Sequence, residues 1–212
     1  MECFKRHIYL MRHGSAGFGV KSDFDRKLTA VGQAEVRHQV DRFQQPDGIR
    51  PDCIFCSTAT RTRQTAAILS HLFQGIPVYF RETLYLAPTY RIMDLVRAID
   101  DIFYRPLIIG HNPGLEQMAD LLNHKPAHIT LFPADCVSLS LSVPTWASVR
   151  PGSGQIQQIF SGKITCETDQ AVLEQGKRGI HDCQEKAKKS ICSGRKRVSA
   201  GAKTAGTNYP KD

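Results

Sequence analysis

The stretch Ile8-Tyr9-Leu10-Met11-Arg12-His13-Gly14 joins an apolar run of strand length to a cation, an imidazole and a glycine. A short apolar run bounded by glycine predicts a buried strand. In open α/β sheets, ligands gather just beyond the carboxyl ends of strands, which is where Arg12 and His13 follow. Gly14 has no Cβ, so a ligand or another backbone segment can approach it closely. The stretch alone also fits an ordinary surface loop with two basic residues, so its meaning depends on whether the pattern returns.

The pattern returns twice. Cys53-Ile54-Phe55-Cys56 leads into a helical pattern that begins near Arg61, and Leu107-Ile108-Ile109 is followed by Gly110-His111. A helix N-terminus offers unpaired N–H groups and the positive end of the helix dipole, so Arg61 adds to a favourable anion site. Each residue alone could be a solvated loop residue, but like charges brought together repel unless an anion lies among them. The expected anion is a phosphoryl group, which arginine binds bidentately.

The chain as far as residue 162 predicts alternating strands and helices. Beyond the three strands above, it predicts helices after Thr29, after Arg61, over 90–102 and after Pro113, and strands at 76–80, 136–143 and 155–160. Thr29 is the expected N-cap of its helix, and the alternating segment 136–143 is expected at an exposed edge. The order βαβαβαβα with a terminal hairpin predicts an α/β fold, a three-layer α/β/α sandwich around a mainly parallel sheet.

Length and composition limit the kind of protein. The 212 residues are 41% hydrophobic and 23% charged, which suffices for one sizeable core. No run approaches the roughly 18 apolar residues of a membrane span, and residues 1–6 lack the apolar segment of a signal peptide. We expect a soluble, cytoplasmic protein without a membrane partner.

The seven cysteines indicate neither a disulfide framework nor a metal site. Their number is odd, and Cys53, Cys56 and Cys136 fall in apolar runs where cysteine behaves as a small hydrophobic residue. Cys53 and Cys56 form a C-x-x-C, but no second pair has zinc-ligand spacing. We expect no metal and no cofactor.

The net charge of +8 is concentrated near the C-terminus. From Lys163 onward, eleven Lys and Arg residues stand against six Asp and Glu residues, which accounts for +5. Because apolar periodicity is weak after Leu173, we predict a domain of residues 1–162 and a basic, disordered tail of residues 163–212. Basic runs in this tail could touch nucleic acid, but a basic tail is more often a solvated segment, so we expect no nucleic-acid partner.

Taken together, these motifs resemble the histidine phosphatase superfamily. The resemblance lies in Arg12-His13-Gly14, in Ser57-x-x-x-Arg61-x-x-x-Thr65-Ala66 and in Gly110-His111. The small bacterial phosphohistidine phosphatases of the SixA type are most similar in the segments Leu10–Gly14, Arg61–Ala66 and Ile109–Pro113. The resemblance covers about residues 6–162 and implies a phosphoglycerate mutase-like fold. It also implies that His13 attacks phosphorus and becomes phosphorylated, and that water then hydrolyses the phosphohistidine. Arg12, Arg61 and His111 would bind the phosphoryl oxygens.

Elementary chemistry fits those roles. His13 must be neutral to attack, and nearby arginines lower its pKa by like-charge repulsion. His111 can donate a hydrogen bond to the transferring group. Glu82 is the one good candidate for a general acid, although a solvated loop carboxylate explains it equally well. Relatives that carry cap segments place them between the positions of Thr65 and His111, and the absence of a long insertion there implies a shallow site open to a protein side chain.

Three functions therefore remain open. The first is a phosphatase that acts on a phosphohistidine-bearing protein. The second is a phosphatase of small phosphorylated molecules, which would need Glu82 as its acid. The third is a non-catalytic module that binds a phospho-ligand or nucleic acid. Intact Arg12, His13, Arg61 and His111 argue against the third, and the missing cap argues against the second. The partner and the oligomeric state stay open.

Overall fold

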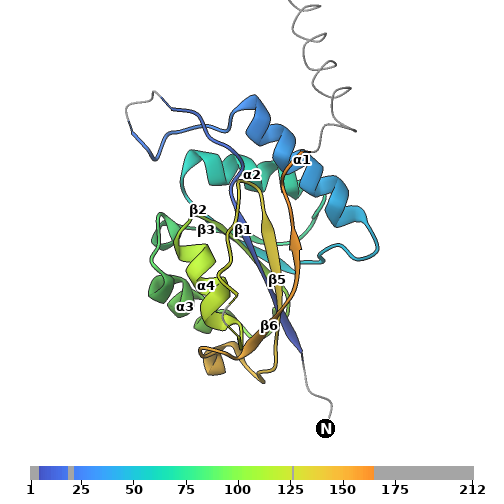
Figure 1. Cartoon of the computed structure of the whole chain (residues 1–212), viewed down its shortest axis with the longest axis vertical. Helices are drawn as coiled ribbons and strands as arrows, with labels where there is room; N and C mark the ends of the chain where they lie inside the picture. Colours follow the sequence, from blue (N-terminus) through green and yellow to red (C-terminus); the bar gives the residue numbers. More distant parts are fainter. Residues whose placement is uncertain (1–4, 19–21, 126, 165–212) are drawn as a thin grey trace, which may run out of the picture. The chain divides into compact units, whose positions relative to one another are not determined.

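A six-stranded sheet in the order β3-β2-β4-β1-β5-β6 carries the fold (Figure 1). The computed structural model describes residues 5–18, 22–125 and 127–164. The strands are β1 (Arg6–Arg12), β2 (Cys53–Ser57), β3 (Val78–Arg81), β4 (Pro106–Gly110), β5 (Cys136–Leu141) and β6 (Gly154–Phe160). The helices are α1 (Ala30–Gln44), α2 (Thr60–Ser70), α3 (Thr89–Arg97) and α4 (Gly114–Leu122), with short 3-10 turns η1 (Glu82–Leu84) and η2 (Trp146–Ser148).

The sheet is parallel from β3 through β2 and β4 to β1. Strand β5 then pairs antiparallel with β1, and β6 pairs antiparallel with β5. The predicted α/β class with a mainly parallel sheet is confirmed. The predicted edge position of 136–143 is wrong, because β5 lies between β1 and β6 and five of its six residues are buried. Its alternation arises from two small serines, of which Ser138 is buried at 7% exposure and Ser140 is half-buried. Alternation shows that one face of the strand is less apolar than the other, but it does not show whether another strand pairs with its free edge.

The two faces of the sheet bury separate apolar clusters, because successive side chains of a strand point to opposite faces. Ile8 and Leu10 pack in the cluster that includes α3 and α4, and Tyr9 and Met11 pack in the cluster that includes α1 and α2. Figure 1 shows these helix pairs on opposite sides of the strands. The predicted three-layer sandwich is confirmed.

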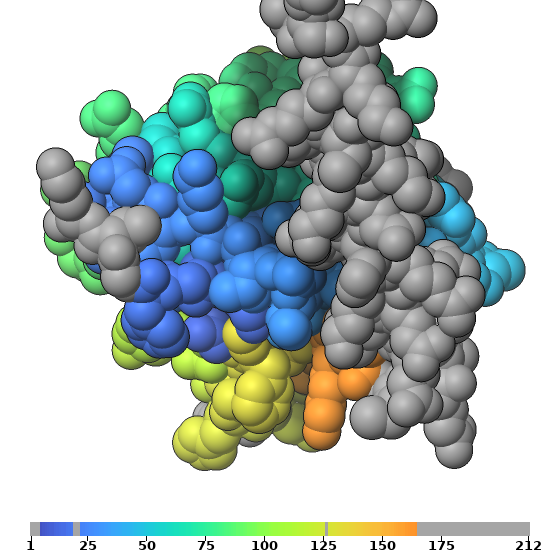
Figure 2. Space-filling view, turned by 90° about the horizontal axis from the view of Figure 1, so that it is seen from above, coloured from blue at the N-terminus to red at the C-terminus, as the bar shows by residue number. Residues whose placement is uncertain are grey.

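Helix α1 is held at its start and in its middle. The Thr29 hydroxyl accepts the Gly32 N–H at 2.9 Å, as expected for an N-cap. The buried Gln39 side chain donates to the carbonyls of Ala134 and Phe160 at 2.9 and 2.8 Å. In Figure 2 the blue surface that includes α1 borders the yellow segment that leads to β5 and the orange end of β6. Gln39 thus ties α1 to the antiparallel end of the sheet.

The C-x-x-C pair lies on β2 with its two thiols on opposite faces of the sheet. Cys53 belongs to the cluster under α3 and α4, and Cys56 to the cluster under α1 and α2. Burial raises the pKa of Cys56 to about 12. The two thiols therefore do not face a common ion. Within the described ranges, no three His, Cys, Asp or Glu side chains gather in a way that could hold a metal.

Each helix in the described part of the chain is too short or too polar to cross a bilayer. The packed chain continues past β6 to Gly162, whose N–H donates to the Asp135 carboxylate at 2.7 Å. Apart from Lys163 and Ile164, the predicted tail of residues 163–212 lies outside the described residues.

Candidate active site

The carboxyl ends of β1, β2 and β4 meet at one edge of the sheet. Arg12 pairs with Gly110, and Cys56 with Ile109, so the residues that follow these strands come together. His13, Arg61 and His111 are all buried there, with 8%, 2% and 3% exposure. The convergence that strand order predicts is present in the structure.

His13 is held as a neutral imidazole with a defined tautomer. Its Nδ1 lies 2.7 Å from the Gly14 carbonyl, which can only accept, so Nδ1 carries the hydrogen. Its Nε2 accepts the Arg61 Nε–H at 3.0 Å. Burial, with repulsion by Arg61 and Arg12, lowers the pKa of His13 to about 4, although the Gly14 hydrogen bond acts in the opposite direction. Sequence reasoning attributed the lowered pKa of His13 to the arginines, but burial is the larger cause.

The loop that carries His13 is pressed against α1. The Gly14 N–H donates to the Thr65 hydroxyl at 3.3 Å. A Cβ on Gly14 would lie 2.5 Å from the Gly32 carbonyl oxygen and 2.9 Å from a Val36 methyl. Gly14 is therefore required for close approach of the two segments, which fixes the imidazole position.

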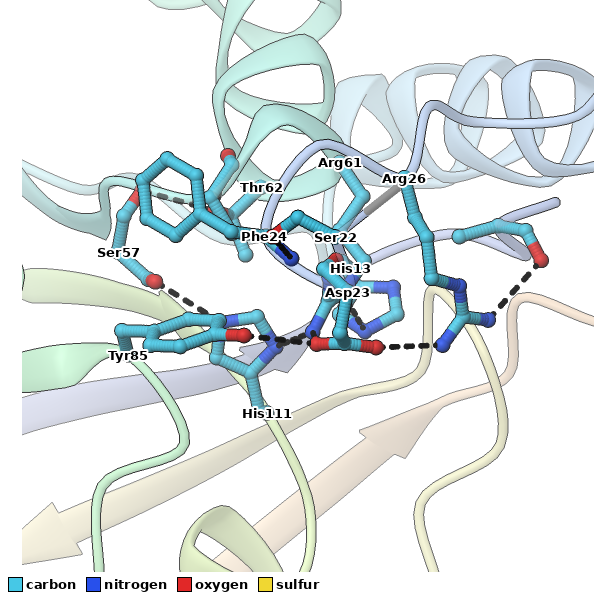
Figure 3. A network of polar contacts seen from close by, with 12 residues as sticks. His13, Ser22, Asp23, Phe24, Arg26, Ser57, Arg61, Thr62, Tyr85 and His111 are labelled. Atoms are coloured by element: carbon cyan, nitrogen blue, oxygen red, sulfur yellow. Dashed lines mark hydrogen bonds and ion pairs between the residues drawn. The ribbon is translucent and has the colours of Figure 1, made fainter. Parts of the chain in front are cut away.

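Arg61 links the two histidines. It lies in the first turn of α2, and its Nη2 lies 3.2 Å from His111 Nδ1 while its Nε bonds His13 (Figure 3). The two imidazole centroids are 5.2 Å apart. A single guanidinium thus sets the spacing of both rings.

The His111 tautomer follows from its neighbours. Arginine only donates, so His111 Nδ1 accepts, and the hydrogen on Nε2 is donated to the Ser57 hydroxyl oxygen at 2.8 Å. Burial, together with repulsion by His13 and Arg61, lowers the pKa of His111 to about 3. Ser57 is a site residue to which sequence reasoning gave no role, although it stood in the quoted spacing before Arg61.

An acidic residue that sequence reasoning missed completes the network. Asp23 Oδ2 accepts from Arg61 Nη2 at 3.0 Å and from the Tyr85 hydroxyl at 2.9 Å, and Oδ1 accepts from Arg26 at 2.8 Å (Figure 3). The Asp23 carbonyl accepts from Arg61 Nη1 at 2.6 Å. The hydrogen bond from Arg26, with those from Tyr85 and Arg61, lowers the pKa of Asp23 to about 2. The chain itself therefore places one anion among its clustered cations. Asp23 lies in the segment between His13 and the cap of α1, and no sequence motif marks it.

Arg12 keeps a donor for a further anion. Its Nη1 donates to the Leu131 carbonyl at 2.8 Å, but its buried Nε has no hydrogen-bond partner among the described residues. A buried N–H without a partner is costly. A phosphoryl oxygen beside Arg12 would satisfy it.

Glu82 is not part of this network. It begins η1 and is exposed, and its carboxylate makes no hydrogen bond or ion pair with another residue in the described ranges. Tyr85, three residues later, is the one that reaches Asp23. The structure brings together four of the five predicted site positions and leaves Glu82 apart.

Comparison with known proteins agrees with this geometry. A sequence model of the histidine phosphatase superfamily (branch 1) matches residues 8–85, from the strand before His13 to Tyr85. SixA from Nakamurella multipartitia, a proposed phosphohistidine phosphatase, is 27% identical with a TM-score of 0.62, over 74% of this chain and 95% of its own. The chain is therefore similar to the histidine phosphatase superfamily in sequence over residues 8–85 and to SixA in fold.

Other similar proteins agree with this match. The protein histidine phosphatase SixA complexed with tungstate has a TM-score of 0.64 over 74% of this chain and 97% of its own, and at 19% identity it shows the shared fold. An uncharacterised protein of Mycobacterium tuberculosis is 29% identical over 152 residues, which is 67% of this chain and 93% of that protein. The match to the family model and the similarity to SixA from Nakamurella multipartitia support a phosphatase enzyme.

Proposed function

We propose that this protein hydrolyses phosphohistidine on a partner protein through a covalent phosphohistidine on His13. The observation that carries the proposal is the neutral His13, whose Nε2 lone pair lies 3.0 Å from the Arg61 guanidinium. A neutral imidazole can attack phosphorus, and a guanidinium beside it can hold the transferred group.

Phosphoryl binding must rearrange one contact. The Arg61 Nε–H donates to His13 Nε2, so a phosphoryl oxygen has to take over that donor before the lone pair can attack. Arg61 and the unpartnered Nε of Arg12 then bind oxygens of the group. The Gly14 carbonyl keeps the hydrogen on Nδ1 and stabilises the positive charge that develops on the His13 ring.

His111 can also serve the phosphoryl group without moving. The Ser57 hydroxyl rotates freely between donor and acceptor roles. When it donates to His111 Nε2, the imidazole hydrogen resides on Nδ1, on the side of Arg61. Once Arg61 Nη2 turns from His111 Nδ1 to the phosphoryl group, His111 donates from Nδ1 to a phosphoryl oxygen and stays neutral.

The leaving group favours phosphohistidine over an alkyl phosphate. An alkoxide must be protonated as it leaves, and a positioned acid contributes roughly 10²–10⁴-fold. Glu82 lies outside the network, and the Asp23 carboxylate is ionised. An imidazole leaving group can be protonated by solvent before attack, so it has no need of such an acid.

Turnover by the full chain tests the proposal. The purified protein is assayed against a phosphohistidine-bearing protein and a panel of phosphorylated metabolites. We expect the phosphohistidine protein to be the best substrate, and acid-labile phosphate to be trapped on wild type but not on His13→Ala. Because His13 lies on a loop, circular dichroism should show the variant folded. Wild-type turnover by His13→Ala would exclude the covalent mechanism, and preference for an alkyl phosphate would favour the metabolite phosphatase.

A further inference from the structure

We propose that Asp23 determines leaving-group specificity by accepting a hydrogen bond from the substrate imidazolium, on the ring nitrogen that is not bonded to phosphorus. This inference rests on the proposed phosphohistidine phosphatase function and deepens it. It concerns which protonation state of the substrate the enzyme selects.

The placement of Asp23 follows from in-line geometry. In phosphoryl transfer the nucleophile and the leaving group lie on opposite sides of phosphorus. His13 is only 8% exposed, so a leaving group opposite it points toward solvent. The Asp23 side chain is 42% exposed and contacts the same guanidinium that bonds His13. In Figure 3, Asp23 and Tyr85 lie beside Arg61 and the two histidines. The carboxylate therefore borders the path by which the leaving group departs.

The charge of Asp23 decides what it can do there. Three donors, from Arg26, Arg61 and Tyr85, surround its two oxygens. They hold its pKa near 2, so it accepts hydrogen bonds at neutral pH and has no proton to give. An imidazolium N–H beside it is stabilised, whereas a developing alkoxide is repelled.

The step balances without a further reactant. The His13 Nε2 lone pair forms a bond to phosphorus, and the bond from phosphorus to the substrate ring nitrogen breaks. The bonding pair stays on that nitrogen, while the other ring nitrogen keeps the proton that Asp23 holds. The product leaves as neutral imidazole, and water later hydrolyses the phosphoryl group from His13.

A ratio of two activities tests the inference. For wild type and Asp23→Asn, kcat/KM is measured with a phosphohistidine peptide and with p-nitrophenyl phosphate, whose leaving group needs no proton. The ratio is kcat/KM for the phosphohistidine peptide divided by kcat/KM for p-nitrophenyl phosphate. Because hydrogen bonds to charged groups are strong, we expect Asp23→Asn to lower this ratio roughly tenfold or more. Asp23→Glu, which keeps the charge, should recover most of the ratio.

Asp25→Asn is the matched control, because Asp25 is an exposed acid of the same loop whose side chain makes no hydrogen bond or ion pair in the described ranges. Its ratio should equal that of wild type. An equal loss of kcat/KM on both substrates in Asp23→Asn would mean that Asp23 only positions Arg61. That result would overturn this inference and leave the proposed function standing. Wild type that hydrolyses p-nitrophenyl phosphate but not the phosphohistidine peptide would overturn the proposed function and this inference together.

Discussion

Two buried neutral histidines make the stability of the domain depend on pH. His13 and His111 have pKa values lowered from 6.5 to about 4 and about 3 in the folded protein. Between those values and 6.5 the unfolded chain binds more protons than the folded one, so the free energy of unfolding falls as the pH falls. Asp23 acts in a lower window, because its pKa is lowered from 3.8 to about 2 and its contribution is lost only below about pH 4.

We therefore expect urea unfolding to show a lower free energy of unfolding at pH 5 than at pH 7. His111→Asn removes one of the two groups and should weaken this pH dependence. His71→Asn, at an exposed position, is the control and should keep it. An unchanged pH dependence in His111→Asn would contradict the assignment.

Glu82 and Arg61 should respond differently to substitution. Glu82→Gln is expected to slow phosphohistidine hydrolysis by much less than the roughly 10²-fold that loss of a general acid would cost. Arg61→Ala should slow it severely, because the guanidinium stabilises charge in the transition state. Single-turnover rates with a phosphohistidine protein measure both. Near-complete loss of activity in Glu82→Gln would give that residue the acid role.

The four predicted residues that the structure brings together lie at or shortly after the carboxyl ends of β1, β2 and β4. His13 and His111 could be predicted because strand order alone brings the carboxyl ends of parallel strands together. Asp23 and Tyr85 could not, because their positions depend on how two loops fold over Arg61, and neither residue stands in a spaced motif. Loop conformation depends on tertiary contacts that no local pattern records.

At the scale of elements, the contact between the His13 loop and α1 is the tightest constraint on the site. Gly14→Ala would force a Cβ to within 2.5 Å of the Gly32 carbonyl, so α1 or the loop must shift. Overpacking of this kind costs about 1–3 kcal/mol. We expect Gly14→Ala to lower both the free energy of unfolding and the turnover rate.

Gly17→Ala is the matched control, because its added Cβ would meet no atom closer than 3.9 Å. Denaturant unfolding and phosphatase assays should leave Gly17→Ala close to wild type. Similar behaviour of the two variants would show that the site tolerates movement of the loop.

The order of elements was predictable, and the position of β5 was not. Helix and strand periods identify each element by its own residues, as at Thr29 and along Ile8–Met11. Strand neighbours depend on pairing between distant segments, so β5 was misplaced at an edge. β3, predicted at 76–80, occupies Val78–Arg81, because strand ends are set by the partner strand β2.

At the scale of the whole molecule, the domain boundary remains a prediction. A chain that ends at Gly162 should fold and turn over as the full chain does, because it keeps the Gly162 contact with Asp135. A chain that ends at Ile159 should be unstable, since it loses Phe160, which is 2% exposed and packs on Phe43. Soluble yield, thermal unfolding and activity of the two shortened chains test this boundary. Failure of the Gly162 chain would show that residues beyond it are needed by the domain.

The first strand is made early and paired late. β1 pairs with β4 and β5, whose residues begin at Pro106 and Cys136. At about 5–20 residues per second, roughly ten seconds of synthesis separate β1 from β5. During that interval Ile8, Leu10 and their neighbours have no sheet partner, and contacts between distant segments form slowly. A nascent chain therefore exposes the apolar segment that leads to His13 until its sheet partners have been made, and the site can assemble only after β4 and β5 have left the ribosome.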